Sequence, residues 1–349
     1  MGIDYYSISI CLLYLSLYEE EYFMEKLKTV LSIILGIVFV ILLLIAKDYF
    51  KMRSEKLLIM KNDLTESYYD KNKLKVMLRE NLGEKYTGEI KTDFDNFVLT
   101  KVLSSISELE NEKYKRYNSF LSIEDMKEYT DSRRNKAEHI NGKPINEETY
   151  YLDINHFFDG VTFKKVFSLS HQFRNYKNLI IDLRDNSGGT FDELKDVASL
   201  FLEKGKVIYQ LNYGNKKDVF VSNNGESFVF SNIVILANYN TASVSELFIL
   251  ALKENLSNVK VIGTRTYGKA ISYSFRNFKD GSAMVFITSV MLDANNAPIN
   301  INGIQPDIMI GNTEDFYNSI LDEKKRKEAV DIDSKRQLDE ALNYLNAKK

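Results

Sequence analysis

The sequence predicts an α/β fold in which helices cover a mixed, mainly parallel sheet, preceded by a helical region and one N-terminal transmembrane helix. Three observations predict it. Thr29–Ala46 carries no charged side chain, residues 54–130 are charged and show helical spacing, and from residue 148 onward short apolar runs alternate with helical patterns. Alternating strands and helices favour a parallel sheet, because each crossover helix returns the chain to the same edge.

The amino-acid composition limits the kinds of chemistry that the chain can perform. The chain has 349 residues, of which 44% are hydrophobic and 27% charged, and this excludes a disordered chain. Its net charge is −3, so we expect no nucleic-acid partner. One cysteine and three histidines exclude a disulfide scaffold and leave little material for a metal centre. We therefore expect no metal and no cofactor, and a chemistry of hydroxyls, amines, carboxylates and backbone amides.

The first predicted element is a membrane anchor at residues 29–46. At 1.5 Å per residue this helix is about 27 Å long, close to the thickness of a bilayer core. A buried core helix is the alternative, but the segment lacks the polar face of a soluble helix. No small-x-small pattern follows it, which favours an uncleaved anchor over a signal peptide. Basic residues flank both ends, so charge does not orient it.

An unusual leader, residues 1–28, precedes the anchor. Residues 1–23 contain four acidic side chains and no Lys or Arg, whereas Met24 opens a conventional signal anchor. Glutamate codons are purine-rich, so Glu19–Glu21 are consistent with an encoded ribosome-binding site. We expect translation to begin at Met24. The chain then contains no cysteine, which suits an oxidising exterior.

A helical region follows at residues 54–130. Its apolar residues recur at spacings of one, three and four, as in an amphipathic helix: Phe97, Val98, Val102, Leu103, Ile106 and Leu109. A second helix is predicted to open at Ser122, with Asp125 in its first turn. We expect this region to mediate a homodimer. Residues 131–147 are polar, contain Gly142 and Pro144, and predict a linker.

The core is predicted at residues 148–312. Leu179–Leu183 and Ile233–Ala237 are apolar runs rich in β-branched residues, each followed by a polar turn and a helical pattern. An antiparallel hairpin is expected from residues 219–222 and 227–230, with Asn-Asn-Gly in its turn.

A second hairpin is expected around Lys279–Gly281. The segment 313–349 then predicts a C-terminal helix with one apolar face, made of Leu338, Ala341, Leu342 and Leu345.

The first motif that can carry chemistry is Asp182–Gly189, at the end of a predicted buried strand. Ligands of open α/β sheets gather at such strand ends. Paired glycines let the backbone turn sharply and direct N–H groups at an anionic oxygen. A plain strand-to-helix turn explains this motif equally well.

The second motif is Thr241–Glu246. Ser243 and Glu246 have the spacing of a capping box, which alone explains them. A serine at a helix start also lies where helix-terminal amides stabilise charge on an attacked carbonyl.

The third motif, Gly263–Lys269, places a lysine beside glycines. Burial disfavours the ammonium form of a lysine, and a neutral lysine is a general base for a hydroxyl.

Taken together and in this order, the three motifs resemble the C-terminal processing (tail-specific) serine peptidases, which are Ser/Lys enzymes with a ClpP/crotonase-type core. The resemblance covers residues 95–345. It implies that Ser243 is the nucleophile, with Ser245 as the alternative hydroxyl, and that Lys269 is the base. It also implies an oxyanion hole made by Gly188 or Gly189 with a backbone amide at the serine turn.

The sequence departs from the family pattern in three places. The family has a glutamine four residues after the lysine, where this chain has Tyr273, so Tyr273 or Ser272 is expected to orient the lysine. Ser187 stands where the family carries proline. Only the linker lies where many members insert a PDZ domain, so we expect none there.

These expectations describe a single-pass cell-membrane protein with an extracytoplasmic catalytic domain that hydrolyses protein or peptide substrates through an acyl-enzyme. Two alternatives stay open. One is a catalytically inactive peptide-binding or scaffold member of the same fold, favoured by Tyr273. The other is an acyl-CoA enzyme, which would use the Gly-Gly amides and need neither Ser243 nor Lys269.

Overall fold

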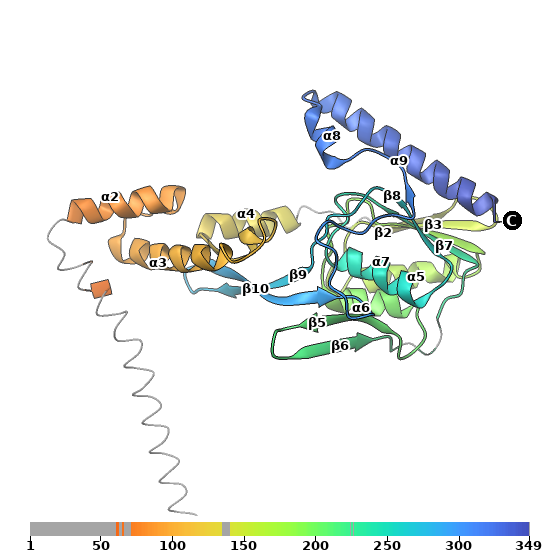
Figure 1. The fold of residues 1–349 in the computed structure, drawn as a ribbon, viewed down its shortest axis with the longest axis horizontal. Coiled ribbons are helices and arrows are strands. Elements are labelled where there is room, and N and C mark those ends of the chain that lie inside the picture. Colours follow the sequence, from red (N-terminus) through yellow and green to blue (C-terminus); the bar gives the residue numbers. More distant parts are fainter. Residues whose placement is uncertain are drawn as a thin grey trace, which may run out of the picture. The chain divides into compact units, whose positions relative to one another are not determined.

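A computed structural model describes residues 61–62, 65, 71–134, 140–223, 225 and 227–348 (Figure 1). The chain divides into two compact units, one ending at Val98 and one beginning at Leu99. The described part of the first unit contains three elements: α2 (Lys71–Leu82), a short 3-10 helix η2 (Gly83–Lys85) and the start of α3 (Ile90–Ser107). Its core is a stripe on α2 formed by Leu74, Leu78 and Leu82, which recur every four residues on one helix face.

The predicted membrane segment at residues 29–46 lies outside the described residues. Among the helices that the structure does describe, none is long and apolar enough to cross a membrane.

The second unit carries the predicted α/β core. Its elements, after the end of α3, are η3 (Lys115–Tyr117), β1 (Ser119–Leu121), α4 (Ile123–Arg134), β2 (Ile140–Pro144), β3 (Thr149–Ile154), α5 (Thr162–Phe173), β4 (Asn178–Asp182), α6 (Phe191–Ser199), β5 (Val207–Asn212), β6 (Lys217–Val221), β7 (Asn232–Ala237), α7 (Val244–Asn255), β8 (Val259–Gly263), β9 (Ile271–Asn277), β10 (Ala283–Leu292), β11 (Ile308–Met309), α8 (Glu314–Ser319) and α9 (Glu323–Asn346). The two predicted strands appear as β4 and β7, and the predicted helix opening at Ser122 appears as α4, where Ser122 Oγ accepts from Asp125 N at 3.1 Å.

The larger sheet has the strand order β11-β8-β7-β4-β3-β2 and is parallel except for β2. Its central strands are buried on both faces. On β4, Leu179 and Ile181 face one cluster of apolar side chains, while Ile180 faces another. This explains why the middle of β4 and most of β7 are continuously apolar, since both faces of a parallel sheet are covered by helices.

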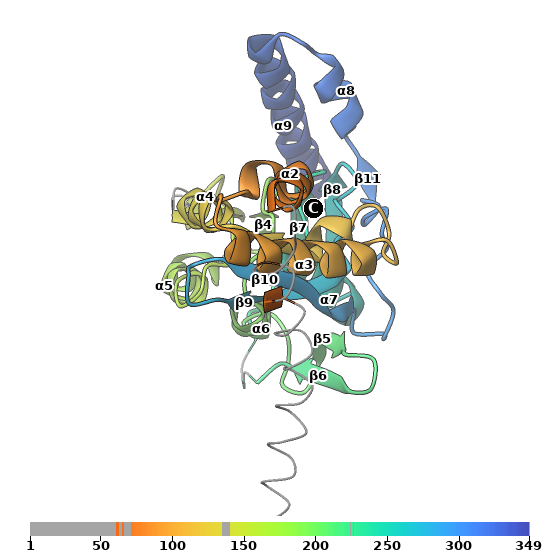
Figure 2. The same ribbon diagram turned by 90° about the vertical axis from the view of Figure 1, so that its left-hand side faces the viewer.

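Helices lie on both sides of this sheet. Helices α5, α6 and α7 lie on one side and α9 on the other (Figures 1 and 2). Ala341 and Leu345 of α9 are buried against side chains of β4, β7 and β8, while Leu338 and Leu342 pack at the edge of the same cluster. The apolar face predicted for the C-terminal helix is therefore confirmed. The mixed α/β fold with a mainly parallel sheet is confirmed as well.

A second sheet, with the order β1-β10-β5-β6 and β9 beside β10, is antiparallel throughout. The hairpin predicted around Lys279–Gly281 is confirmed as β9 and β10. The hairpin predicted from residues 219–222 and 227–230 is wrong. Strand β6 instead pairs back onto β5 through the turn at Tyr213–Lys216, and residues 227–230 form no strand. The Asn-Asn-Gly motif predicts a turn from local sequence alone. Strand β5, which precedes β6, is a longer partner for it than residues 227–230.

The linker predicted at residues 131–147 is partly wrong. Helix α4 continues to Arg134, and Ile140–Pro144 form β2, which pairs antiparallel with β3 at the edge of the larger sheet. Pro144 does not prevent this pairing, because a proline at the end of an edge strand need not donate to a ladder.

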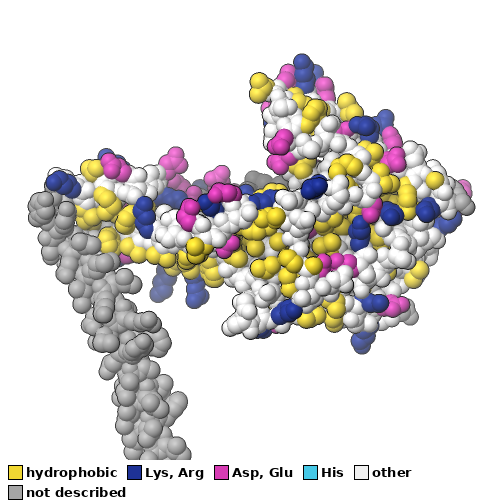
Figure 3. All heavy atoms as spheres, in the orientation of Figure 1, with side chains coloured by type: hydrophobic (Ala, Val, Ile, Leu, Met, Phe, Trp, Pro, Cys, Tyr) yellow, Lys and Arg dark blue, Asp and Glu magenta, His cyan; other side chains and the backbone are white. Residues whose placement is uncertain are grey.

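On the face of the second unit seen in Figure 3, basic and acidic side chains are interspersed.

Helix α3 exposes apolar side chains. Leu103 of the predicted amphipathic stripe is 3% exposed, whereas Val102 and Ile106 are 54% and 43% exposed. Part of the apolar face that the sequence predicts is therefore open to solvent in the single chain.

The end of α7 gives a prediction for stability. Burial, together with the neighbouring Asp293 carboxyl, raises the pKa of Glu254 to about 7, although Ala294 N donates to it at 2.9 Å. A carboxyl whose pKa is raised by folding stabilises the fold below its unfolded pKa, and this stability is lost as the pH rises through the folded value. Between pH 5 and pH 8 the free energy of unfolding should fall by about 1–2 kcal/mol from this group, after allowance for its partial exposure.

Urea titrations of the full chain at both pH values measure this change. Glu254→Gln, which mimics the protonated acid, should remove most of it. A difference between pH 5 and pH 8 that is equally large in Glu254→Gln would contradict the assignment.

Candidate active site

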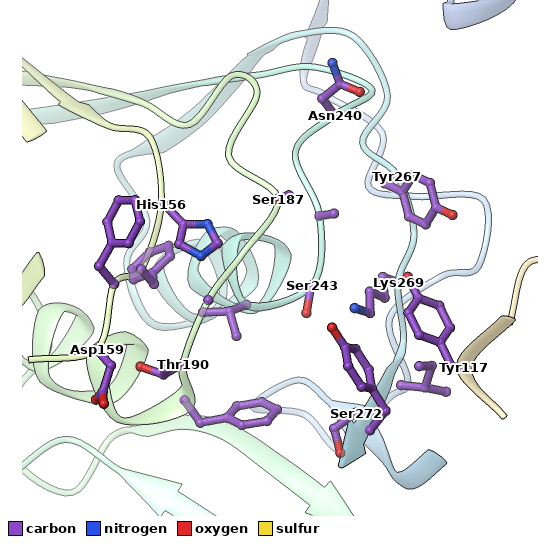
Figure 4. Close-up of a pocket in the computed structure, with 18 of the residues that line it drawn as sticks. Tyr117, His156, Asp159, Ser187, Thr190, Asn240, Ser243, Tyr267, Lys269 and Ser272 are labelled. Carbon is purple, nitrogen blue, oxygen red and sulfur yellow. The ribbon is translucent and has the colours of Figure 1, made fainter. Parts of the chain in front are cut away.

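A cleft of about 910 Å³ opens where the loops after β3, β4 and β7 meet (Figure 4). The carboxyl ends of these parallel strands lie at one edge of the sheet, as the sequence predicts. The cleft brings together most of the predicted site residues. Its lining includes Gly189, Ser243, Lys269, Ser272 and Tyr273.

Ser243 is the N-cap of α7, and the predicted capping box with Glu246 is present. Its backbone has φ 62° and ψ −120°, a conformation rare for a residue with a side chain. Such strain is found where the surrounding structure imposes it, often at functional sites. Ser243 is 8% exposed, and its hydroxyl points into the cleft (Figure 4). Ser245, the alternative hydroxyl, is fully buried, and its Oγ has no hydrogen-bond partner among the described residues.

Lys269 reaches the same cleft from the loop between β8 and β9. Its side chain and that of Ser243 point toward each other (Figure 4). Two tyrosine rings contact the amine: Nζ lies 4.5 Å from the ring centroid of Tyr117 and 4.3 Å from that of Tyr273. These rings stack on each other with centroids 4.9 Å apart. An ammonium group over aromatic faces is stabilised electrostatically, and the rings also restrict where the amine can move.

The two residues predicted to orient the lysine are arranged differently. Tyr273 packs its ring face against Nζ. Ser272 shares hydrogen bonds with two hydroxyls of β10, those of Thr288 at 3.0 Å and Ser289 at 2.6 Å. Of these two residues, Tyr273 is therefore the one that contacts the lysine amine, through its aromatic face.

The Gly-Gly loop lies directly against the serine turn. Gly188 has φ 105°, and a Cβ at this position would lie 3.0 Å from both Ala242 O and Ser243 Cβ. Its N–H donates to Asn186 Oδ1 at 2.9 Å. Gly189 and Val244 instead line the cleft beside Ser243. Of the two glycines predicted for the oxyanion hole, Gly188 thus donates its N–H within its own loop, and Gly189 is the one that lines the cleft.

Gly188→Ala should lower kcat for the peptide cleavage that the family resemblance implies about tenfold or more, because the added methyl group displaces the serine turn by a few tenths of an ångström. A peptide-cleavage assay measures this. Gly214→Ala is the matched control, since Gly214 has φ 90° and nothing within 4 Å of its added Cβ. Equal effects of the two substitutions would show that backbone strain alone is responsible.

Glu246 has a larger role than the helix cap that the sequence predicts. It is fully buried. Its Oε2 accepts from the N–H groups of Ser243 at 2.8 Å and Lys269 at 2.9 Å. Its Oε1 accepts from Gly268 N at 2.7 Å and Thr266 Oγ1 at 2.5 Å. Burial raises the pKa of Glu246, and these four hydrogen bonds oppose that rise. One carboxylate therefore ties the serine turn to the lysine loop.

Other residues of the site were not found from the sequence. Tyr117 belongs to no local motif of the site, since the partners that bring it there, Lys269 and Tyr273, are more than 150 positions away. His156 is another such residue: it lines the cleft on the side of Ser243 opposite Lys269 in the view of Figure 4. The residues that the structure describes contain no group of three or more His, Cys, Asp or Glu side chains able to hold a metal.

Comparison with known proteins agrees with this architecture. Residues 148–310 match the model of peptidase family S41. This region of the chain is therefore similar to peptidase family S41. The predicted family resemblance is thereby confirmed, and the matched S41 region contains Gly188, Gly189, Ser243 and Lys269.

Two curated relatives resemble part of this chain. A probable CtpA-like serine protease of Staphylococcus aureus (strain COL) is 35% identical over 136 residues, which cover 38% of this chain and 27% of the relative. A protein of the same description from Staphylococcus saprophyticus is 34% identical over 146 residues, covering 41% and 29%. The matched region thus spans little more than a quarter of the length of these relatives.

Two solved structures are also similar to this chain. The photosystem II D1 C-terminal processing protease has a TM-score of 0.41 and 24% identity, covering 48% of this chain and 44% of that one. A lipoprotein from Streptococcus agalactiae has a TM-score of 0.49 and 18% identity, covering 72% and 88%.

Proposed function

We propose that this chain is a serine endopeptidase that cleaves peptide bonds through Ser243 and Lys269. The observation that carries the proposal is the meeting of these two side chains in one cleft, with the strained serine at a helix start (Figure 4). The match of residues 148–310 to peptidase family S41 and the serine protease descriptions of the curated relatives support it.

The proposed reaction has two stages. Ser243 Oγ attacks the substrate carbonyl carbon while its proton passes to Lys269 Nζ, and the oxyanion accepts from the N–H groups of Gly189 and Val244. The carbon–nitrogen bond then breaks, and Lys269 returns the proton to the leaving amine. A water molecule attacks the acyl ester, Lys269 takes its proton, and release of the acid regenerates the Ser243 hydroxyl. No metal or cofactor takes part in these steps.

The experiment is to incubate the purified full chain, in detergent, with unfolded casein and to quench it in acid. Mass spectrometry should find casein fragments and a chain whose acyl adduct maps to the peptide containing Ser243. An adduct on a different residue, or cleavage that a chelator abolishes, would overturn the proposal.

The alternative is an inactive peptide-binding member of the same fold. The observation that favours it is the pair of rings around Lys269, because cation–π contact stabilises the charged amine and a charged amine cannot act as a base. Binding of casein peptides by a well-folded chain, without any fragment or adduct, would favour this alternative.

We also propose that residues 29–46 anchor the chain in the cell membrane with the S41 domain outside the cytoplasm. The support is the uncharged apolar run in the sequence. In a Gram-positive host the full chain should resist carbonate extraction, and protease added to protoplasts should degrade the S41 domain. Extraction by carbonate or full protection from protease would contradict it. The predicted homodimer remains a proposal, supported by the exposed side chains of Val102 and Ile106 on α3.

A further inference from the structure

A short segment upstream of the region matched to family S41 contacts the lysine loop. This segment, Lys113–Asn118, lies between α3 and β1 and includes η3. The Lys113 ammonium donates to the backbone oxygen of Ile301 at 2.9 Å and to that of Tyr267. Burial lowers the pKa of Lys113, while the charges of Glu246 and Glu314 oppose this. The segment thus fastens to the loop just before Lys269.

Tyr114 makes the contact that lies nearest to Lys269 in the chain. Its hydroxyl donates to Gly268 O at 2.8 Å and accepts from Ala270 N at 3.0 Å. Gly268 and Ala270 are the residues on either side of Lys269. Tyr114 is 6% exposed, and burial raises the pKa of its phenol, so it remains a neutral hydroxyl that can make both bonds. One hydroxyl therefore bridges the backbone across the lysine.

The loop needs such support because its own sequence gives little stiffness. Gly268 has φ 86°, and a Cβ there would lie 2.3 Å from Ile301 O, so glycine is required. Glycine leaves the backbone with more conformational freedom than other residues. Glu246 holds the N–H groups of Gly268 and Lys269, and Tyr114 holds Gly268 O and Ala270 N. Together they fix every polar backbone group from Gly268 N to Ala270 N except Lys269 O.

We propose that Tyr114 is a positioning residue for Lys269, so that the active site of this chain extends beyond residues 148–310 to the segment Lys113–Asn118. This inference rests on the proposed function, in which the Lys269 amine must meet Ser243 Oγ at hydrogen-bond distance. A displacement of about 1 Å in a reacting group can lower a rate by about 10²-fold. The hydroxyl of Tyr114 sets where the lysine side chain starts, and it comes from outside the S41 match.

The test compares Tyr114→Phe with the wild type in the full chain. Phenylalanine keeps the ring but can neither donate to Gly268 O nor accept from Ala270 N. Amide hydrogen exchange in the peptide spanning residues 266–272 should become about tenfold faster or more, with the rest of the second unit unchanged. The kcat for peptide cleavage should fall about 10- to 100-fold, while KM stays within about twofold.

Tyr150→Phe is the matched control. Tyr150 is also a buried tyrosine, and its hydroxyl donates to Gln172 Oε1 at 3.0 Å, away from the lysine loop. Its substitution removes one buried hydroxyl and should change neither kcat nor exchange at residues 266–272. Melting temperatures of both variants report any general loss of stability.

Each outcome decides the inference. Unchanged exchange at residues 266–272 in Tyr114→Phe overturns it, as does faster exchange with an unchanged kcat, or an effect on KM alone. Equal losses of kcat in Tyr114→Phe and Tyr150→Phe overturn it too, since they would reflect stability. If the wild type cleaves nothing, the proposed function fails, and exchange alone then decides whether Tyr114 holds the lysine loop.

Discussion

Ser243→Ala is expected to lower kcat/KM for peptide cleavage by a factor on the order of 10³–10⁶, because it removes the atom that attacks the carbonyl. Lys269→Met should have a similar effect. Methionine keeps an unbranched side chain that can pack against the rings of Tyr117 and Tyr273 but has no amine to accept the proton. Both variants should keep the wild-type melting temperature to within a few degrees.

The double variant makes the prediction sharper. If the serine and the lysine act as one unit, Ser243→Ala combined with Lys269→Met should be no slower than either single variant. Ser245→Ala is the control, because Ser245 is two positions away and fully buried. It should keep near-wild-type cleavage. A Ser243→Ala chain that retains a tenth of the wild-type activity, or a Ser245→Ala chain that loses it, would show that the wrong hydroxyl has been assigned.

The central strands could be predicted because their sequence reports burial directly. Leu179–Ile181 and Ile233–Ala237 are apolar without interruption, as expected for strands covered on both faces. The antiparallel sheet was harder to predict. Strand β6 follows an alternating pattern that fits several partners, and pairing with β5 or with a later segment is decided by the rest of the sheet.

The candidate site likewise contains residues that the sequence predicts and residues that it does not. Ser243, Lys269 and the Gly-Gly loop lie in motifs whose local spacing is informative. Glu246 was recognised only as a cap, because its three bonds to the lysine loop join residues 20 to 23 positions apart. Tyr114 and Tyr117 meet that loop across more than 150 positions. No periodicity or local motif encodes such a contact, so only the folded chain reveals it.

The second large effect is expected from Glu246→Gln. The amide keeps the shape of the carboxylate but replaces one acceptor oxygen by an NH₂ group. That group must then face either Gly268 N or the N–H groups of Ser243 and Lys269, which are donors and cannot accept. Leaving a buried donor unsatisfied costs about 1–3 kcal/mol, so the free energy of unfolding should fall by about 2–4 kcal/mol. Because the same atoms connect the serine turn and the lysine loop, kcat should fall about 100-fold.

A second buried glutamate provides a control that distinguishes an effect on stability from an effect on catalysis. Glu193 is 6% exposed, and its Oε2 accepts from Phe163 N of α5 at 2.6 Å rather than from the serine turn or the lysine loop. Glu193→Gln should lower the urea midpoint and leave kcat close to the wild-type value, whereas Glu246→Gln should lower both. If the two variants lose kcat in proportion to their loss of stability, Glu246 is a structural acid only. If kcat collapses in Glu246→Gln alone, one buried carboxylate both caps α7 and aligns the nucleophile with its base.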